Sequence, residues 1–166
     1  MSKYNTIIDN DIVNGEGVCV SFFVQGCPHH CPGCFNEETW DFNGGQEYTE
    51  ETRWDIIKLI GANGLQRNFS ILGGEPLALQ NIPMVWEVIN TVRHAFPHIK
   101  IFLWTGYTLP ELRQREKGAL RDILKTIDVL IDGPFIQEEA DLNLKLRGSK
   151  NQHIWIRKDE DWILEE

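Results

Sequence analysis

The sequence lacks the features that mark membrane and secreted proteins. No apolar run approaches the roughly 20 residues that a helix needs to cross a bilayer. The first residues, MSKYNTIIDNDIVNGEG, contain no basic region followed by an apolar one, so we expect no secretory signal. We therefore predict a cytoplasmic protein. In that compartment thiols stay reduced, and clustered cysteines bind metal or do redox chemistry more often than they form disulfides.

Positive charge is also scarce. Lys and Arg number 16 against 25 Asp and Glu, which gives a formal net charge of −9. Nucleic-acid binding needs clustered Lys and Arg, and no stretch has such a cluster, so we expect no nucleic-acid partner. The locally basic LKLRGSKNQHIWIRK and the acidic tail RKDEDWILEE are both interpreted as ordinary solvated surface.

Repeats, low-complexity segments and Ser/Gly linkers are absent as well. We therefore predict a single domain over residues 1–166, with its core at about 12–157. A chain of 166 residues that is 42% apolar is long enough to bury one sizeable core.

Segments typical of strands alternate with segments typical of helices. β-branched and aromatic runs predict strands at 18–26, 69–74, 99–106, 128–133 and 153–158. Apolar periodicity predicts helices at 49–64, 82–96 and 108–127. Thr49 suits the start of the first helix and Trp54, Ile57 and Ile60 its apolar face, while Gly118 could split the third helix. This alternation predicts an α/β fold with a mostly parallel sheet. Because a full eight-stranded barrel takes about 250 residues, we expect an open or partial β/α barrel.

Glycine-marked turns follow four of the predicted strands. The turns are QGC, GGEP, TGY and DGP, each at the C-terminal end of its strand. In parallel α/β folds that edge carries the ligand site. Glycine also simply ends strands, but four such turns on one edge, one of them carrying cysteines, favour a shared cavity.

Three of the four cysteines lie in QGCPHHCPGCFN, where Cys27, Cys31 and Cys34 have the spacing C-x3-C-x2-C. Structural zinc sites usually take four protein ligands, often as two close pairs, and no second CxxC or HxxxH follows. His29 and His30 could supply a fourth ligand, although we interpret both as solvated loop residues. Three thiolates that hold a four-iron cluster would leave one iron open to a reacting molecule.

The fourth cysteine, Cys19, lies eight residues before Cys27 inside a predicted strand. We expect it to be a buried free thiol and not a ligand. A thioredoxin-like redox pair of Cys31 and Cys34 is a further alternative, but that motif opens a helix and needs no third cysteine.

The cysteine motif resembles the signature of radical S-adenosylmethionine enzymes, which also place GGEP after their second strand, as at 73–76 here. Together, NGEGVCVSFFVQGCPHHCPGCFN, GGEP, WTGYT, DVLIDGPF and LNLKLRGSKNQ resemble the activating proteins of anaerobic ribonucleoside-triphosphate reductase. The likeness covers about 12–156, most of the chain. Gly33 stands where many radical enzymes carry an aromatic residue, and Phe35 follows the third cysteine. This departs from the superfamily pattern but is what the smaller family shows.

This resemblance implies a [4Fe-4S] cluster on Cys27, Cys31 and Cys34, with S-adenosylmethionine bound to the open iron. In such enzymes, one electron from the reduced cluster cleaves the cofactor to methionine and a 5′-deoxyadenosyl radical. That radical takes a hydrogen from one glycine of the large reductase subunit. The implied partners are that large subunit and a low-potential electron donor such as a flavodoxin. The implied cofactor-binding residues are Gly33, Cys34, Phe35, Gly73, Gly74, Glu75, Thr105 and Asp132.

Several of these roles stay open. Glu75 could orient its turn, receive the cofactor's ammonium group or be a solvated turn acid. Asp132 could face the cavity or cap the DGP turn. Thr105 and Tyr107 are candidates for contact with ribose or adenine. In the segment LRGSKNQ, the candidates for binding the cofactor carboxylate or contacting the partner are Arg147, Lys150 and Asn151. The segment could also be an exposed loop.

Three other functions remain as alternatives: an activase of another glycyl-radical enzyme of the formate-lyase type, a zinc-stabilised interaction module without catalysis, and a small-molecule radical enzyme. Brown protein with about four irons per chain would support the cluster, and colourless protein with one zinc would support the module. We expect the short partial barrel to leave one side of its cavity open, where the partner's glycine loop would enter.

Overall fold

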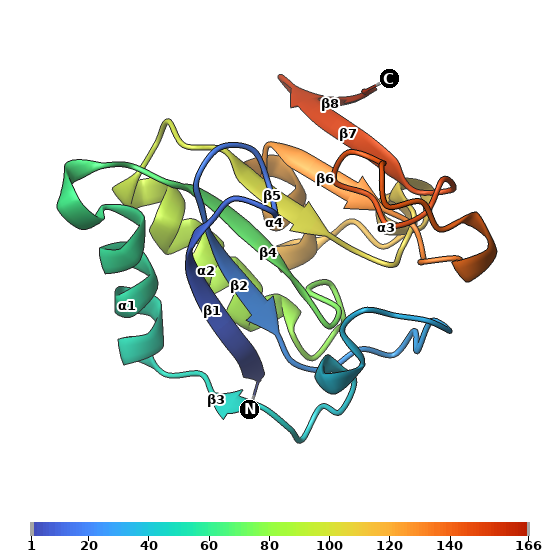
Figure 1. Ribbon diagram of the computed structural model, residues 1–166. Helices are drawn as coiled ribbons and strands as arrows, with labels where there is room; N and C mark the ends of the chain where they lie inside the picture. Colours follow the sequence, from blue (N-terminus) through green and yellow to red (C-terminus); the bar gives the residue numbers. More distant parts are fainter. Residues whose placement is uncertain (1, 166) are drawn as a thin grey trace.

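A computed structural model describes residues 2–165 and arranges them around one eight-stranded sheet of order β3-β1-β2-β4-β5-β6-β7-β8 (Figure 1). The strands are β1 (Lys3–Asp11), β2 (Cys19–Val24), β3 (Gln46–Glu47), β4 (Asn68–Gly73), β5 (Ile101–Trp104), β6 (Val129–Asp132), β7 (His153–Lys158) and β8 (Asp161–Leu164). The helices are α1 (Glu50–Ile60), α2 (Ile82–Ala95), α3 (Leu109–Gln114) and α4 (Gly118–Thr126). Within residues 2–165, no helix has the length and apolar character needed to span a membrane.

The centre of the sheet is parallel and its flanks are antiparallel. β2, β4, β5 and β6 pair in parallel. β1 pairs antiparallel with β2 and β3, and β7 pairs antiparallel with β6 and β8. The predicted α/β class is confirmed, but the prediction of a mostly parallel sheet is wrong. Only the central strands are joined through helices, whereas the connections from β1 to β2 and from β7 to β8 reverse the chain without a helix.

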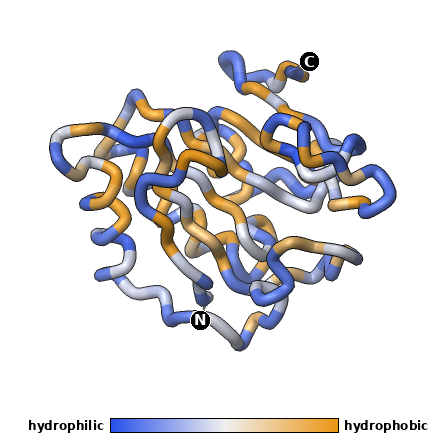
Figure 2. Tube along the Cα trace, in the orientation of Figure 1, coloured by the Kyte–Doolittle hydropathy of each residue, from blue (hydrophilic) through white to orange (hydrophobic). Residues whose placement is uncertain are grey.

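Helices α1, α2 and α4 lie along one face of the sheet (Figure 1). Alternate residues of the central strands, such as Phe22, Ile71 and Leu103, join these helices in the main apolar core. The residues between them point to the other face, where Phe102 and Ile131 belong to a second, smaller cluster. Burial on both faces explains why the central strands read as continuous apolar runs. Figure 2 shows these runs as hydrophobic segments and the connecting loops as mainly hydrophilic.

Local signals set the helix ends. The Thr49 side chain accepts a hydrogen bond at the start of α1, as predicted. The predicted third helix is indeed two helices, because α3 ends at Gln114 and α4 begins at Gly118, where φ is +56°. The predicted apolar face of α1 is only partly right. Ile60 is buried, but Trp54 is 47% exposed.

The connection between β1 and β2 folds over the N-terminal half of the open face. A Cβ atom on Gly15 would lie 2.6 Å from Cys19 Sγ and 2.8 Å from Ser70 Oγ, so a side chain there would collide with strands β2 and β4. Cys19 is fully buried and free, as predicted. It lies at the end of β2 opposite to the cysteine loop, roughly 16 Å along the strand from Val24.

Asp11 fixes the start of this connection, and we expect its replacement by asparagine to have a pH-dependent cost. Burial raises the pKa of Asp11, but hydrogen bonds from Ser21, Asn14 and Val13 outweigh burial and hold the pKa below 3.8. The ionised carboxylate therefore stabilises the fold above that pH, and this contribution is lost as the pH falls through the folded-state pKa. We expect Asp11→Asn to lower the free energy of unfolding by about 1–2 kcal/mol near neutral pH.

Urea unfolding of the wild-type protein and of Asp11→Asn across the acidic pH range measures this difference in the free energy of unfolding. It should shrink below about pH 3.8, where the carboxylate of the unfolded chain is protonated. A difference that stayed constant down to the lowest pH at which the protein folds would contradict the account.

Candidate functional site

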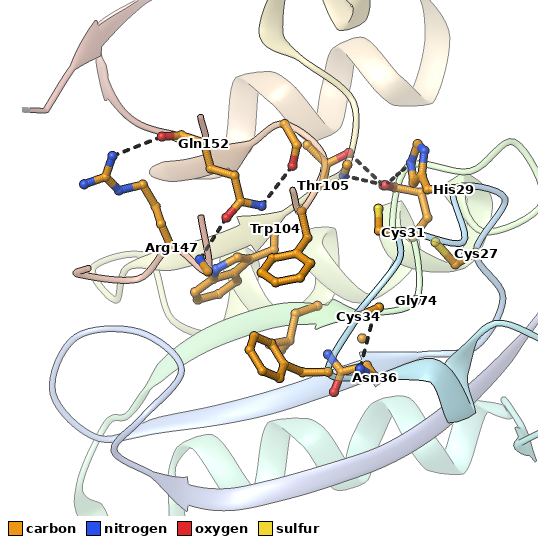
Figure 3. Close-up of a pocket in the computed structure, with 18 of the residues that line it drawn as sticks. Cys27, His29, Cys31, Cys34, Asn36, Gly74, Trp104, Thr105, Arg147 and Gln152 are labelled. Atoms are coloured by element: carbon orange, nitrogen blue, oxygen red, sulfur yellow. Dashed lines mark hydrogen bonds and ion pairs between the residues drawn. The ribbon is translucent and has the colours of Figure 1, made fainter. Parts of the chain in front are cut away.

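A cavity of about 500 Å³ lies at the C-terminal ends of β2, β4 and β5, on the face of the sheet opposite to the helices (Figure 3). Phe23, Leu72 and Trp104 line it from these three strands. All four glycine-marked turns contribute to its wall, through Cys27, Gly73, Gly74, Thr105, Gly106 and Gly133. The predicted shared cavity is therefore present.

The three clustered cysteines all line this cavity and are partly exposed. The Cys34 amide donates to the Cys31 carbonyl at 3.1 Å, which makes a tight turn, and the Cys27 amide donates to the Trp40 carbonyl at 3.1 Å. In the described part of the chain, no three Cys, His, Asp or Glu side chains stand close enough together to hold a metal ion. The three thiols thus share one cavity.

The Cys27 thiol is the most protected of the three. Burial raises its pKa to about 11, and the negative charge of Glu75 acts in the same direction. The thiol is therefore neutral at physiological pH in the metal-free protein. A metal ion that bound this sulfur would displace its proton.

The side chains nearest to the cysteines are already engaged elsewhere. His29 Nε2 lies 2.7 Å from Glu75 Oε1, and the His29 side chain is only 19% exposed. The interpretation of His29 as a solvated residue is therefore wrong. His30 is exposed, as predicted, and its ring stacks on Trp40 with centroids 4.5 Å apart. With Cys19 at the far end of β2, the donor set at the cavity is three thiols, which fits a four-iron cluster with one open iron better than a four-ligand zinc site.

Glu75 is the polar centre of the site. It is fully buried. Oε1 accepts from the Gly106 amide at 2.7 Å and faces His29 Nε2. Oε2 accepts from the Leu77 amide and from Thr105 Oγ1, both at 2.8 Å. The interpretation as a solvated acid is wrong. Glu75 lines the cavity, and through these four contacts it ties the cysteine loop, the GGEP turn and the TGY turn together.

Comparisons with known proteins agree with this geometry. A family model described as a 4Fe-4S single cluster domain matches residues 13–155. The chain is 41% identical over 153 residues to a Vibrio cholerae protein named anaerobic ribonucleoside-triphosphate reductase-activating protein, covering 92% of this chain and 96% of the relative. Proteins of the same name from Escherichia coli K12 (39% identical, covering 92% of this chain and 97% of the relative) and from phage T4 (37%, 96% and 97%) are also similar. The chain belongs to the anaerobic ribonucleoside-triphosphate reductase-activating protein family. The resemblance inferred from its motifs is confirmed.

The paired glycines of this family member are required by the backbone itself. A Cβ atom on Gly73, where φ is +109°, would lie 2.8 Å from the backbone of Val24. One on Gly74 would collide with the Gly26 carbonyl oxygen. The Gly74 and Glu75 amides already donate to Val24 and Gly26 at 3.0 and 2.8 Å. Any hydrogen bond from this turn to a ligand must therefore use its carbonyl oxygens.

Of the other residues predicted to contact the cofactor, some line the cavity and some do not. Phe35, 66% exposed, and Thr105 line the cavity. Gly33 does not line it, because its α-carbon faces the side chain of Gln137. Tyr107 does not line it either; its ring packs edge-on against His29 at 4.6 Å.

Asp132 lies outside the cavity, although it was predicted to bind the cofactor. The residue is 1% exposed, and its Oδ2 accepts from the Leu109 amide at 2.7 Å, at the start of α3. Asp132 points away from the cavity because Ile131, the residue before it in β6, belongs to the cluster on the cavity face, and successive residues of a strand point to opposite faces. Of the alternatives for Asp132, a capping role agrees with these contacts, but the group that it caps is α3.

Arg147 and Gln152 form the wall opposite to the cysteines (Figure 3). Arg147 Nη1 donates to the Gln152 carbonyl at 3.1 Å, and Nε is buried without a hydrogen-bond partner among the described residues. Gln152 ties the segment to β6 by donating to the Gly133 carbonyl at 2.9 Å. Lys150 is exposed and Asn151 lies outside the cavity. The sequence motif LRGSKNQ marked this segment but could not say which of its residues point inward.

Proposed function

We propose that the protein activates an anaerobic ribonucleoside-triphosphate reductase by generating a glycyl radical on its large subunit. In this proposal, Cys27, Cys31 and Cys34 hold a [4Fe-4S] cluster and the cavity binds S-adenosylmethionine. When bound and reduced, these cofactors supply the one-electron cleavage of a carbon–sulfur bond and hence the radical that abstracts hydrogen. The observation that carries the proposal is that three thiols line one cavity of about 500 Å³ while the neighbouring histidines and Cys19 are engaged elsewhere.

The residues around the cavity would position the S-adenosylmethionine. A volume of about 500 Å³ suits a ligand of that size. The carbonyl oxygens of the Gly73–Gly74 turn suit the ammonium group, because the turn amides are already used. Phe35 offers an exposed ring for the adenine, and Thr105 borders the same space. Arg147 lines the cavity on the side opposite to the cysteines, and its buried Nε, which has no partner among the described residues, suits the carboxylate.

The proposal also covers the fold and the partners. The parallel strands β2, β4, β5 and β6 with their helices would form the partial β/α barrel, and the antiparallel flanks would leave one side open. The glycine loop of the large subunit would enter there. A low-potential donor such as a flavodoxin would reduce the cluster, in the cytoplasm, where the thiols stay reduced.

Electron paramagnetic resonance tests this function. We expect an anaerobic mixture of cluster-loaded protein, large subunit, S-adenosylmethionine and reductant to give a doublet signal that follows the large subunit on separation. Mixtures without S-adenosylmethionine are the control and should give none. Consumption of S-adenosylmethionine without a radical on the large subunit would contradict the proposed substrate.

Replacement of Arg147 by methionine should weaken S-adenosylmethionine binding. The change removes the cavity's guanidinium and leaves a side chain of similar length. The loss of a charge-assisted contact predicts a dissociation constant higher by about 10- to 100-fold. Lys150→Met is the matched control, because it removes the same charge from an exposed residue three positions away. Equilibrium binding under argon measures both, and equal affinities of the two variants would remove Arg147 from the site.

A further inference from the structure

A second pocket lies beside the cysteine cavity and has no part in the function proposed above. It encloses about 430 Å³ between α3, the end of β6 and the start of β7. Gly133 lines both spaces, so they adjoin at the turn after β6. The wall is largely apolar and includes Pro110, Pro134, Ile136 and Trp155.

Buried polar atoms without partners gather around this pocket. Within residues 2–165, seven buried side-chain nitrogen and oxygen atoms have no hydrogen-bond partner, and three of them belong to residues that line this pocket. They are Asp132 Oδ1, Asn151 Oδ1 and Trp155 Nε1. Buried polar groups are rarely left without a partner, so such a concentration indicates a binding site.

Asp132 sets the chemistry of the ligand. It is 1% exposed, and its Oδ2 is occupied by the Leu109 amide. The nearest basic group to Oδ1 is Nδ1 of His153, at 3.5 Å, which is too long for a good hydrogen bond. Asn151 uses its Nδ2 on the Pro134 carbonyl, at 2.7 Å, and only its oxygen remains free. Two of the residues that line the pocket therefore carry a buried acceptor without a partner, a carboxylate oxygen on Asp132 and an amide oxygen on Asn151, and such acceptors suit an ammonium or guanidinium group.

We propose that this pocket receives a lysine or arginine side chain of the reductase. The two oxygens would accept its hydrogen bonds, the prolines and Ile136 would pack along its aliphatic stem, and Trp155 Nε1 would donate to a backbone carbonyl of the same segment. This inference rests on the proposed function, because it takes the reductase as the partner.

Two observations favour a side chain of the partner as the occupant. This chain carries a net charge of −9, so a basic surface on the partner is complementary to it. The pocket also adjoins the cavity through Gly133, whose carbonyl accepts from the cavity residue Gln152. A partner segment that is anchored in the pocket would hold its neighbouring residues at the cavity beside it.

Asp132→Asn gives the sharpest test. The asparagine oxygen can still accept from Leu109, while its amide presents a donor where the pocket presented a negative acceptor. We expect the affinity of the cluster-loaded protein for the large subunit to fall by about tenfold or more. Trp155→Phe keeps an aromatic ring, removes the indole donor together with one of the two fused rings, and should weaken binding by about two- to tenfold. Asp161→Asn is the control, because it makes the same charge change on an exposed residue of β8.

Anaerobic biolayer interferometry with the immobilised large subunit measures these affinities, and thermal melting verifies that each variant is folded. If Asp132→Asn does not fold, the affinity of Trp155→Phe for the large subunit tests the inference instead. Wild-type affinity in the folded variants would mean that water fills the pocket, and would overturn the inference. Failure of the proposed function has a different signature, because the wild-type protein itself would then produce no radical on the large subunit.

Discussion

Replacing Cys31 by alanine should abolish cluster binding and, with it, the glycyl radical of the reductase. Among the described residues the three thiols of the cysteine loop are the cysteines that line the cavity, and of the adjacent histidines His29 is held by Glu75 while the ring of His30 stacks on Trp40. A cluster left with two thiolates has lost a third of its protein ligands. The wild-type protein should contain about four irons per chain after anaerobic reconstitution, and the variant should retain little. The iron content per chain and the intensity of the radical doublet should fall together.

Cys19→Ala provides the matched control. Cys19 is a fully buried free thiol that donates to the Glu16 carbonyl at 3.4 Å, at the other end of β2. Its removal should cost about 1 kcal/mol of stability and leave the iron content unchanged. If Cys31→Ala kept its iron while Cys19→Ala lost it, the ligand assignment would be wrong.

Replacing Glu75 by glutamine should destabilise the fold more than any other single change of similar size near the site. One carboxylate oxygen becomes an amide, so two of the four donors that point at Glu75 lose their acceptor in a fully buried position. We expect a loss of about 3 kcal/mol in the free energy of unfolding. For a chain of this size, that lowers the melting temperature by roughly 6–12 °C.

Thermal unfolding of the metal-free protein measures this effect without the cluster. Glu87→Gln is the control, because Glu87 accepts from Tyr48 at 2.9 Å but is 48% exposed. Its cost should stay near 1 kcal/mol or less. An unchanged melting temperature for Glu75→Gln, combined with weaker S-adenosylmethionine binding, would return Glu75 to the role of a ligand contact.

Much of the sheet could be predicted because its central strands are buried on both faces. Runs such as VCVSFFV and IFLW have no polar alternation, and only a covered parallel sheet accommodates them. Glycine at the strand ends then located the cavity, since carboxyl ends of parallel strands meet at one edge. The split between α3 and α4 was likewise visible at Gly118.

Of the flank strands, β7 was predicted at 153–158, but β1, β3 and β8 could not be predicted from the same signals. β1 (KYNTIIDND) and β8 (DWIL) are only partly covered and carry charged residues, so their apolar pattern is weak. They are strands because a neighbouring edge is available to pair with them, and that is a tertiary property. Trp54 illustrates the same limit, because helical periodicity groups it with Ile57 and Ile60 although only part of that stripe meets the core.

At the site, residue types were predictable and side-chain directions were not. The cysteine spacing identified the three thiols, but nothing local shows that His29 turns toward Glu75 or that Asp132 turns toward α3. These directions depend on turns that come together only in the folded sheet. Within LRGSKNQ, Arg147 lines the cavity whereas Lys150 is exposed, a difference set by the loop.

Electron–nuclear double resonance on the reduced cluster tests the central claim most directly. One sample would carry ¹⁵N in the amino group of S-adenosylmethionine, and a matched sample would carry ¹⁵N only in the histidines of the protein. We predict strong ¹⁵N coupling to the cluster in the first sample and none in the second. Strong coupling from a histidine, with none from S-adenosylmethionine, would show that the protein itself fills the fourth iron position and would contradict the account.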